Sequence, residues 1–390
     1  MNSDFIHTLE LYYRDDFNEI KELTRNITLV NMKGKYVCTD YSSIGITIYS
    51  LPCMKEGRDG KGNYKLSLVV NPSRLIENDT CINRIEGFRD LSKAIDLLNG
   101  FIRRLFSPLI LNDFKLGRID ITRDIRKIPE SVIQEYILLM RTMTLGYGYQ
   151  KNKKLEEKTK DFRIEDSFNV LNESQGAEFV VYNKHRAAID QGYPENVIEY
   201  YKKTMRMEVR LKRKYIRTHT NYIDTEEAIY YFHANTNTIF KDFYRGMFKY
   251  RTDLCFVSLD WQIRLIHRLY PDSAKEEKLL RIIREIINDR ICSDRLLYDT
   301  YHTKKSTTKK LSPFNELGIS PISIISKKIS FMSSLDSVLG MSFNKKDEMG
   351  KTEETGRKKV TNNVNENTIY EVIKRSKGRK KVIFYVGEKY

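Results

Sequence analysis

Apolar and polar residues alternate over several short stretches near the start of the chain, which is the pattern of half-buried β-strands. Strands are predicted at residues 5–13, 45–51 and 64–70, separated by Gly, Asn and Asp. The spacing changes at residues 87–106, where apolar residues recur every three or four positions. That spacing predicts a helix with one buried side.

Three later segments have strand-like alternation and carry reactive side chains. They span residues 117–124, 178–185 and 205–212, and a helix from 129 to about 144 is predicted between the first two. This order predicts an α+β fold, in which helices cover one face of an antiparallel sheet in a ferredoxin-like arrangement. The other face is then open to a substrate.

The alternation in the last of these segments separates charged from apolar residues. Met205, Met207, Val209 and Leu211 point one way, and Arg206, Glu208, Arg210 and Lys212 point the other. In the same way Arg118 and Asp120 share a face of residues 117–124, and Tyr182 and Lys184 share a face of residues 178–185. The sequence therefore predicts that a tyrosine, a lysine and two carboxylates meet on one sheet face.

Composition narrows the class of partner. The net charge is +16, which favours a polyanion such as nucleic acid. The five cysteines are widely spaced, with no CxxC pair, so they indicate neither a secreted disulfide framework nor a zinc site. With no signal peptide and no apolar stretch of membrane-spanning length, we expect a soluble cytoplasmic protein without a membrane partner.

The character of the sequence divides the chain into three parts. Residues 1–222 are predicted to form the catalytic domain, and residues 223–340 a smaller helical region, including an amphipathic helix at 273–288. That region is interpreted as a packing and specificity appendage rather than a helix-turn-helix module, since a decisive turn signature is missing. Residues 341–390 are charged and predicted to be a basic flexible tail.

The predicted polar face has the parts needed for phosphoryl transfer to a tyrosine. Tyr182 is the candidate nucleophile, and Lys184 is expected to favour its phenolate electrostatically. Asp120 and Glu208 are candidate ligands of Mg²⁺ or Mn²⁺, because hard divalent cations prefer oxygen donors. Four basic residues are predicted to bind DNA phosphates, namely Arg118, Arg206, Arg210 and Lys212.

These three segments carry a family resemblance. Arg118-Ile119-Asp120, Tyr182-Asn183-Lys184-His185 and Arg206-Met207-Glu208-Val209-Arg210-Leu211-Lys212 resemble the replication-associated gene II proteins of filamentous phages and, more distantly, plasmid rolling-circle initiators. The resemblance covers roughly residues 40–250. It implies an HUH-endonuclease-like fold and an origin-specific DNA nickase of a phage or plasmid. The tyrosine of such an enzyme takes the 5′-phosphate covalently, leaves a 3′-OH primer and later reseals the displaced strand, while a host helicase and DNA polymerase extend the nick.

The resemblance assigns the nucleophile to Tyr182 and its companion lysine to Lys184. The His-hydrophobic-His metal pair of many tyrosine nickases is missing here, although His185 can supply one ligand at a strand end. A second tyrosine, Tyr200 or Tyr201, is a candidate for strand closure.

Two other functions compete with an origin nickase. A conjugative or mobilisation relaxase uses the same tyrosine chemistry, and sequence motifs do not separate the two. A non-catalytic DNA-binding protein on the same sheet is the alternative from another class, although the RNP-type aromatic motif of single-strand binders is not evident. The chain has no GxxxxGK[ST] loop, so an NTP-driven helicase is not expected.

Overall fold

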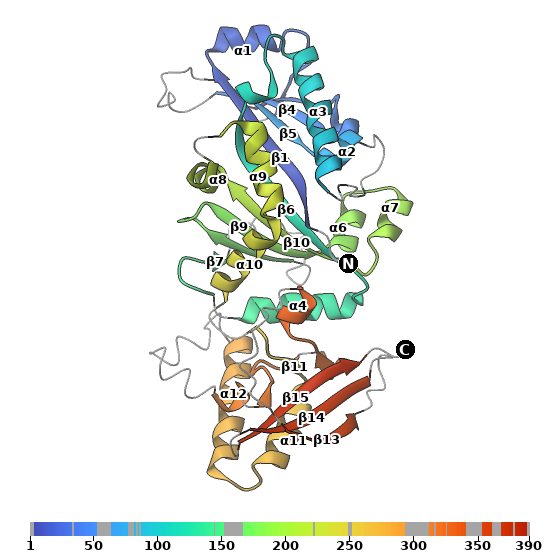
Figure 1. The fold of residues 1–390 in the computed structure, drawn as a ribbon, viewed down its shortest axis with the longest axis vertical. Helices are drawn as coiled ribbons and strands as arrows, with labels where there is room; N and C mark the ends of the chain where they lie inside the picture. The colour runs from blue at the N-terminus through green and yellow to red at the C-terminus, as the bar shows by residue number, and fades with distance from the viewer. Residues whose placement is uncertain are drawn as a thin grey trace. The chain divides into compact units, whose positions relative to one another are not determined.

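The computed structural model places most of the chain (Figure 1). It describes residues 4–32, 35–52, 64–76, 82, 85, 87–143, 145–151, 167–220, 223–248, 252–292, 312–315, 317–324, 326–340, 353–360, 368–376 and 379–387. Two compact units emerge from the contacts within the chain. Unit 1 comprises Met1–Lys127 and Gly148–Tyr244, and unit 2 comprises Ile128–Tyr147 and Arg245–Tyr390.

Unit 1 is built on one antiparallel sheet, which has ten strands among the described residues, in the order β2-β3-β4-β5-β1-β6-β10-β9-β8-β7. The strands are β1 (Asp4–Asp15), β2 (Val30–Met32), β3 (Lys35–Cys38), β4 (Ile46–Pro52), β5 (Tyr64–Val70), β6 (Lys115–Ile125), β7 (Gln150–Lys151), β8 (Ser167–Asn172), β9 (Ala177–Asn183) and β10 (Met205–Lys212). The α+β class and the antiparallel sheet are as predicted. The long strands β1 and β6 lie next to each other in the interior of the sheet, where neighbours cover both of their edges.

The helices of unit 1 are α1 (Phe17–Leu23), α2 (Pro72–Ile76), α3 (Phe88–Leu105), α6 (Lys184–Asp190), α7 (Glu195–Tyr200), α8 (Arg213–Thr220), α9 (Thr225–Ala234) and α10 (Thr236–Met247), the last of which continues into unit 2. Helices α3 and α9 lie in front of the sheet in Figure 1. The stripe predicted for α3 is observed: Leu91, Ile95 and Leu98 are almost fully buried. Leucine and isoleucine at this spacing form one apolar side, and its burial holds the helix to the rest of the unit.

One face of the central strands packs against helices. On β6, Ile119 and Ile121 are inaccessible to solvent, and Arg123, which shares their face, lies 5.0 Å from the ring centre of Phe240 on α10. Arg123 also pairs with Asp4 and donates to Asn237. The side chains that alternate with these three therefore point to the opposite face of the sheet.

Unit 2 holds α4 (Glu130–Thr142), α11 (Leu259–Leu269), α12 (Ala274–Cys292), α15 (Leu335–Val338), the short pair β11 (Phe256–Val257) and β12 (Phe331–Met332), and the sheet β13 (Glu353–Val360), β14 (Thr368–Ser376) and β15 (Arg379–Gly387). The predicted helices at 129–144 and 273–288 are confirmed as α4 and α12. The chain passes from one unit to the other after Lys127, Tyr147 and Tyr244. The predicted domain boundary after residue 222 stays a prediction.

The prediction of a flexible tail is wrong for the described part of residues 341–390. Strands β13, β14 and β15 pair antiparallel in order, with Ser376 opposite Arg379 at the closed end of one hairpin. The physical reason lies in the run Val382-Ile383-Phe384-Tyr385-Val386, since β-branched and aromatic residues favour strands. The basic cluster beside this run drew the interpretation towards a solvated tail.

Candidate active site

The three predicted segments lie on adjacent strands, because β10 pairs with β6 on one side and β9 on the other. Arg206 stands opposite Asp124 on β6 and opposite Tyr182 on β9. Residues opposite one another in neighbouring strands share a face. We call this the polar face; it carries Arg118, Asp120, Thr122, Asp124, Glu178, Tyr182, Arg206, Glu208, Arg210 and Lys212.

The centre of the polar face is a tyrosine bonded to a carboxylate. The phenol of Tyr182 donates a hydrogen bond of 2.6 Å to Oε1 of Glu208. The other oxygen, Oε2, accepts from Nε and Nη2 of Arg210 at 3.1 and 2.8 Å. Glu208 is buried, while Tyr182 is half-buried. A reagent in solvent can therefore reach the tyrosine more readily than the carboxylate behind it.

The protonation states of the pair follow from its surroundings. Burial raises the pKa of Tyr182 well above its ordinary value, and the charge of Glu208 adds to this. Burial also disfavours the Glu208 carboxylate, but the guanidinium of Arg210 and the other positive neighbours outweigh it and lower the pKa of Glu208 to about 2. At neutral pH the pair is thus a phenol hydrogen-bonded to a carboxylate.

One end of the polar face is closed over Arg206. Its side chain is 1% exposed and donates to both carboxylate oxygens of Asp124, from Nε to Oδ1 at 2.6 Å and from Nη2 to Oδ2 at 2.8 Å. The guanidinium carbon lies 5.2 Å from the ring centre of Tyr201 and 5.6 Å from that of Phe5. We call Arg206, Asp124, Tyr201 and Phe5 the closed end. Asp124 and the two rings enclose the guanidinium, so a phosphate has little access to Arg206 in this arrangement, and its predicted contact with DNA stays a prediction.

The opposite end is open. Arg210 is 28% exposed and Lys212 is 49% exposed, and both lie within 4 Å of the Glu178 carboxylate, at 3.8 and 3.7 Å. We call Arg210, Lys212 and Glu178 the open end. Arg118, at the same end of the neighbouring strand β6, is 35% exposed. Three of the four predicted phosphate contacts therefore retain solvent access.

The predicted metal ligands are already paired with arginine. Asp120 is buried, and both of its oxygens accept from Arg118, one of them from Nε at 2.7 Å. Burial raises the pKa of Asp120 in spite of that partner. Among the described residues, no group of three or more His, Cys, Asp or Glu side chains is placed to hold a metal ion. Asp120 and Glu208 share a face as predicted, but a cation between them would have to displace Arg118 and Arg210, so these residues do not fit a Mg²⁺ site.

The sequence predicts that Lys184 lies beside Tyr182 on the same strand, but the structure does not place it there. Strand β9 ends at Asn183, whose side chain accepts from the backbone N–H of Arg186 and so caps α6. Lys184 is the first residue of that helix, and its Nζ lies 4.9 Å from the ring centre of Tyr201 and 5.3 Å from that of Tyr193. An asparagine favours a helix start because its side chain satisfies a free backbone N–H. His185, the other candidate ligand, lies on α6 too.

The two tyrosines proposed for strand closure have different surroundings. Tyr201 is buried at the closed end, where Nη2 of Arg206 lies 3.4 Å from its hydroxyl. Tyr200 is half-buried and bonded to Arg126, whose guanidinium carbon lies 4.2 Å from the ring centre. Tyr200 is therefore the more accessible of the two.

The site also contains His7, which sequence reasoning missed. It lies in β1 where the pairing with β6 shifts register between Ile6 and Thr8, and its Nε2 is 3.4 Å from Nη1 of Arg206. Burial, with the charge of Arg206, lowers the pKa of His7 to about 3, so the ring is neutral at physiological pH. No spacing in the sequence links His7 to Arg206, because only strand pairing brings β1 beside this face.

Comparisons with known proteins give little more. No protein-family model matches the chain, and no curated protein matches it. Among solved structures, the chain is similar to a rolling-circle replication initiator protein from Geobacillus stearothermophilus, at 12% identity and a TM-score of 0.30, over 64% of this chain and 88% of that one. A likeness at this TM-score assigns neither the reaction nor any residue role here. Within the described residues, every helix is too short or too polar to cross a bilayer.

Proposed function

We propose that this protein is a tyrosine nickase that cuts one DNA strand at a replication origin and starts rolling-circle replication. The observation that carries the proposal is the 2.6 Å hydrogen bond from the half-buried phenol of Tyr182 to Glu208. A nucleophile beside a group that can take its proton is the common arrangement for covalent catalysis. The resemblance of the three motifs to gene II proteins supports the same assignment.

The geometry suggests how the first step runs. Tyr182 Oη forms a bond to phosphorus, the bond from phosphorus to the 3′ oxygen breaks, and the phenolic proton passes to Glu208. The departing 3′ oxygen takes a proton from water, which leaves a 3′-OH and a 5′-phosphotyrosine. Because the phenol has a raised pKa and the carboxylate a lowered one, we expect the proton to move as the new bond forms rather than beforehand.

The open end supports a role in holding the strand. Arg118, Arg210 and Lys212 are partly exposed on the same face as Tyr182. Guanidinium and ammonium groups bind phosphate oxygens through charge-assisted hydrogen bonds. With a net charge of +16, the protein is expected to bind DNA strongly at low salt and weakly at high salt.

Magnesium stays a prediction from the sequence, and no step above depends on it. Asp120 and Glu208 bind arginine and tyrosine instead of forming a ligand set. Nicking with Mg²⁺, with Mn²⁺ and with a chelator, on the wild type and on Asp120→Ala, tests the prediction directly. A Mg²⁺ titration midpoint unchanged in Asp120→Ala would remove this residue from any metal site.

A DNA-binding protein without nuclease activity is the second candidate. The observation that favours it is the full pairing of the polar face: each acidic group considered above has a basic or phenolic partner. A conjugative relaxase has the same chemistry as the origin nickase, so the two differ only in the DNA sequence that is cut.

The decisive experiment is incubation of the full chain with labelled single-stranded and supercoiled DNA from its own replicon. A denaturing gel and peptide mapping then detect any covalent adduct. We expect an adduct on Tyr182 in the wild type and none in Tyr182→Phe, which should still bind DNA. Tyr200→Phe is the matched control, and this variant should still make the first cut. Cleavage by Tyr182→Phe at the wild-type rate would refute the assignment, and tight binding without any cut would favour the non-catalytic protein.

A further inference from the structure

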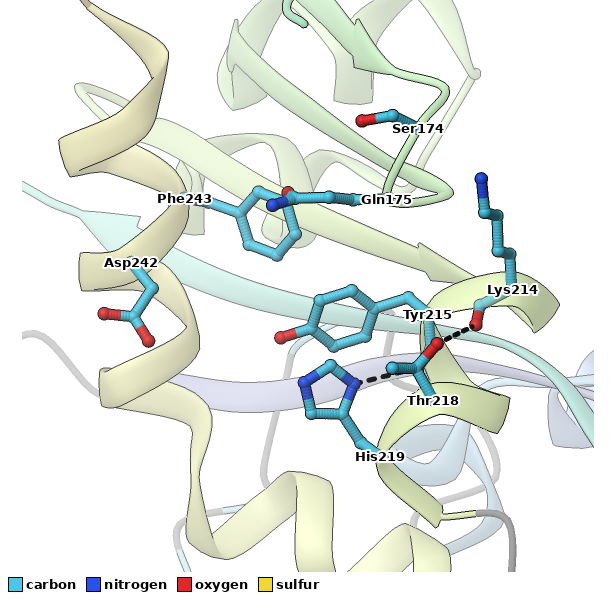
Figure 2. A pocket seen from close by; sticks show the side chains of 8 residues that line it. All are labelled: Ser174, Gln175, Lys214, Tyr215, Thr218, His219, Asp242 and Phe243. Carbon is cyan, nitrogen blue, oxygen red and sulfur yellow. Dashed lines mark hydrogen bonds between the residues drawn. The ribbon is translucent and has the colours of Figure 1, made fainter.

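Unit 1 also contains a cavity of about 400 Å³ between the β8–β9 turn, α8 and α10 (Figure 2). The cavity lies near the start of β9 and the end of β10, whereas Tyr182 lies near the other end of these strands. This volume falls within the range of small-molecule sites. From Ala177, beside this turn, β9 runs five residues to Tyr182, which is roughly 17 Å in an extended strand. The cavity is therefore distinct from the candidate active site.

A glycine allows the turn and the helix to approach. Gly176 has φ of +70°, which disfavours other residues, and a Cβ placed there would lie 2.7 Å from Cβ of Lys214. The backbone continues this contact, because the N–H of Lys212 donates to the carbonyl of Gly176 at 2.9 Å. The wall of the cavity is thus fixed by the backbone and not by mobile side chains alone.

Aromatic rings form much of the lining. The rings of Tyr215 and His219 stack with centroids 4.1 Å apart and planes at 21°, and Tyr215 also lies 5.4 Å from Phe243. Figure 2 shows these three side chains around the opening. Nδ1 of His219 lies 2.9 Å from the backbone carbonyl of Tyr215. Since a carbonyl only accepts, Nδ1 is the donor, and this bond orients the imidazole ring.

The rim of the cavity is polar and basic on one side. Lys214 and Gln175 lie at the opening, and the Asp242 carboxylate lies on the side away from Lys214 (Figure 2). The exposed side chains of Lys212, Arg213 and Arg217 extend the positive charge of Lys214 along the end of β10 and the surface of α8. An anionic ligand is therefore favoured on the α8 side and disfavoured beside Asp242.

We propose that this cavity binds an unpaired base of single-stranded DNA, with the flanking phosphates on Lys212, Lys214 and Arg217. Stacked aromatic rings suit the flat face of a base, and a basic helix suits the backbone. The amide of Gln175 and the carboxylate of Asp242 can bond to the base edge. The proposal rests on the proposed function only in taking DNA as the ligand, since no cleavage step enters it.

The location of the base is tested by cross-linking on the full-length Tyr182→Phe protein, which is not expected to cut DNA. A single-stranded oligonucleotide that contains 5-iododeoxyuridine is irradiated with the protein, and the attached peptide is identified by mass spectrometry. We expect the cross-link at Tyr215 or His219. Cross-links found solely outside the β8–β9 turn, α8 and α10 would overturn the proposal.

Affinity is measured on the same background by fluorescence anisotropy. His219→Ala removes an exposed ring, and we expect binding of the oligonucleotide to weaken about tenfold, as for other base-stacking rings. Lys214→Ala is expected to weaken binding about threefold and to reduce the salt dependence by about one charge. Tyr215→Leu should also weaken binding. Because Tyr215 packs against Phe232 and Phe243, circular dichroism must show that this variant is still folded.

The matched control is Phe88→Ala. Phe88 is 62% exposed and stacks on Tyr230 with centroids 4.7 Å apart, but it does not line the cavity. We expect this variant to bind like its parent. Equal affinities of His219→Ala and Phe88→Ala would refute the proposal. Loss of binding in His219→Ala with no adduct in the wild type would retain the base site and reject the nickase, so the two proposals fail separately.

Discussion

The two ends of strand β10 differ in a way that their sequence does not show. Arg206 and Lys212 are both basic and point to the same face, yet the first side chain is 1% exposed and the second 49%. Arg206 makes two bonds to Asp124 between two aromatic rings. The ammonium group of Lys212 lies 3.7 Å from the carboxylate of Glu178.

The difference teaches that a basic residue on this face is structural where the chain covers it and available to a ligand where it does not. The chain between α7 and β10 brings Tyr201 over Arg206 at the closed end, whereas solvent reaches the open end. A charge removed from water needs a paired, hydrogen-bonded partner. An exposed charge needs none and keeps its affinity for phosphate.

Removing the buried guanidinium is the largest expected break in this comparison. Arg206→Met leaves the Asp124 carboxylate buried without its partner, and we expect the free energy of unfolding to fall by about 3–5 kcal/mol. Chemical denaturation followed by circular dichroism measures this loss. Lys212→Met is the control on the same strand and face, and it should change stability by less than about 1 kcal/mol. Equal losses in the two variants would contradict the distinction between the ends.

Glu208→Gln tests the centre of the face, where the two ends meet. Glutamine can still accept the hydrogen bond from Tyr182 but is a far weaker base, so we expect nicking to slow by about a hundredfold or more. DNA affinity should change much less. Because the pKa of Glu208 is about 2, protonation of this group should not reduce the wild-type rate between neutral pH and about pH 4. A nicking rate in Glu208→Gln equal to the wild type would exclude Glu208 as the proton acceptor.

The neutral His7 ring makes the closed end sensitive to acid. Its pKa is lowered to about 3 in the folded protein from 6.5, so the unfolded chain binds more protons between these values and stability falls as the pH drops below about 6.5. For this partly exposed ring we expect a loss of about 1 kcal/mol between pH 7 and pH 5. His7→Gln should flatten that part of the stability curve. Parallel curves for the variant and the wild type would show that other groups cause the loss.

The smallest effect is expected at the open end. Lys212→Met should weaken binding of single-stranded DNA about threefold and lower the slope of affinity against salt by about one charge. Anisotropy titrations at several salt concentrations give both quantities. An unchanged slope would place the DNA backbone elsewhere on the protein.

Much of the sheet and several helices could be predicted from residue patterns. Strand β5 and strand β10 have the predicted bounds, and α3 begins and ends within one residue of the prediction. Such elements have a long, regular alternation or stripe, which burial on one side enforces. The errors came where the pattern was short or mixed: at Lys184 a capping asparagine ends the strand, and in β13–β15 the many charges obscured the apolar runs.

The sequence by itself determined the strand alternation that puts Asp120, Tyr182 and Glu208 on polar sides of their strands, because side chains in a strand alternate with period two. It also determined the excess of positive charge. Only the tertiary structure decided that Tyr182 bonds Glu208, that Asp120 bonds Arg118, and that His7 approaches Arg206. These contacts depend on strand order and register and on which segment covers each end of the face, and such long-range pairings leave no periodic trace in the sequence.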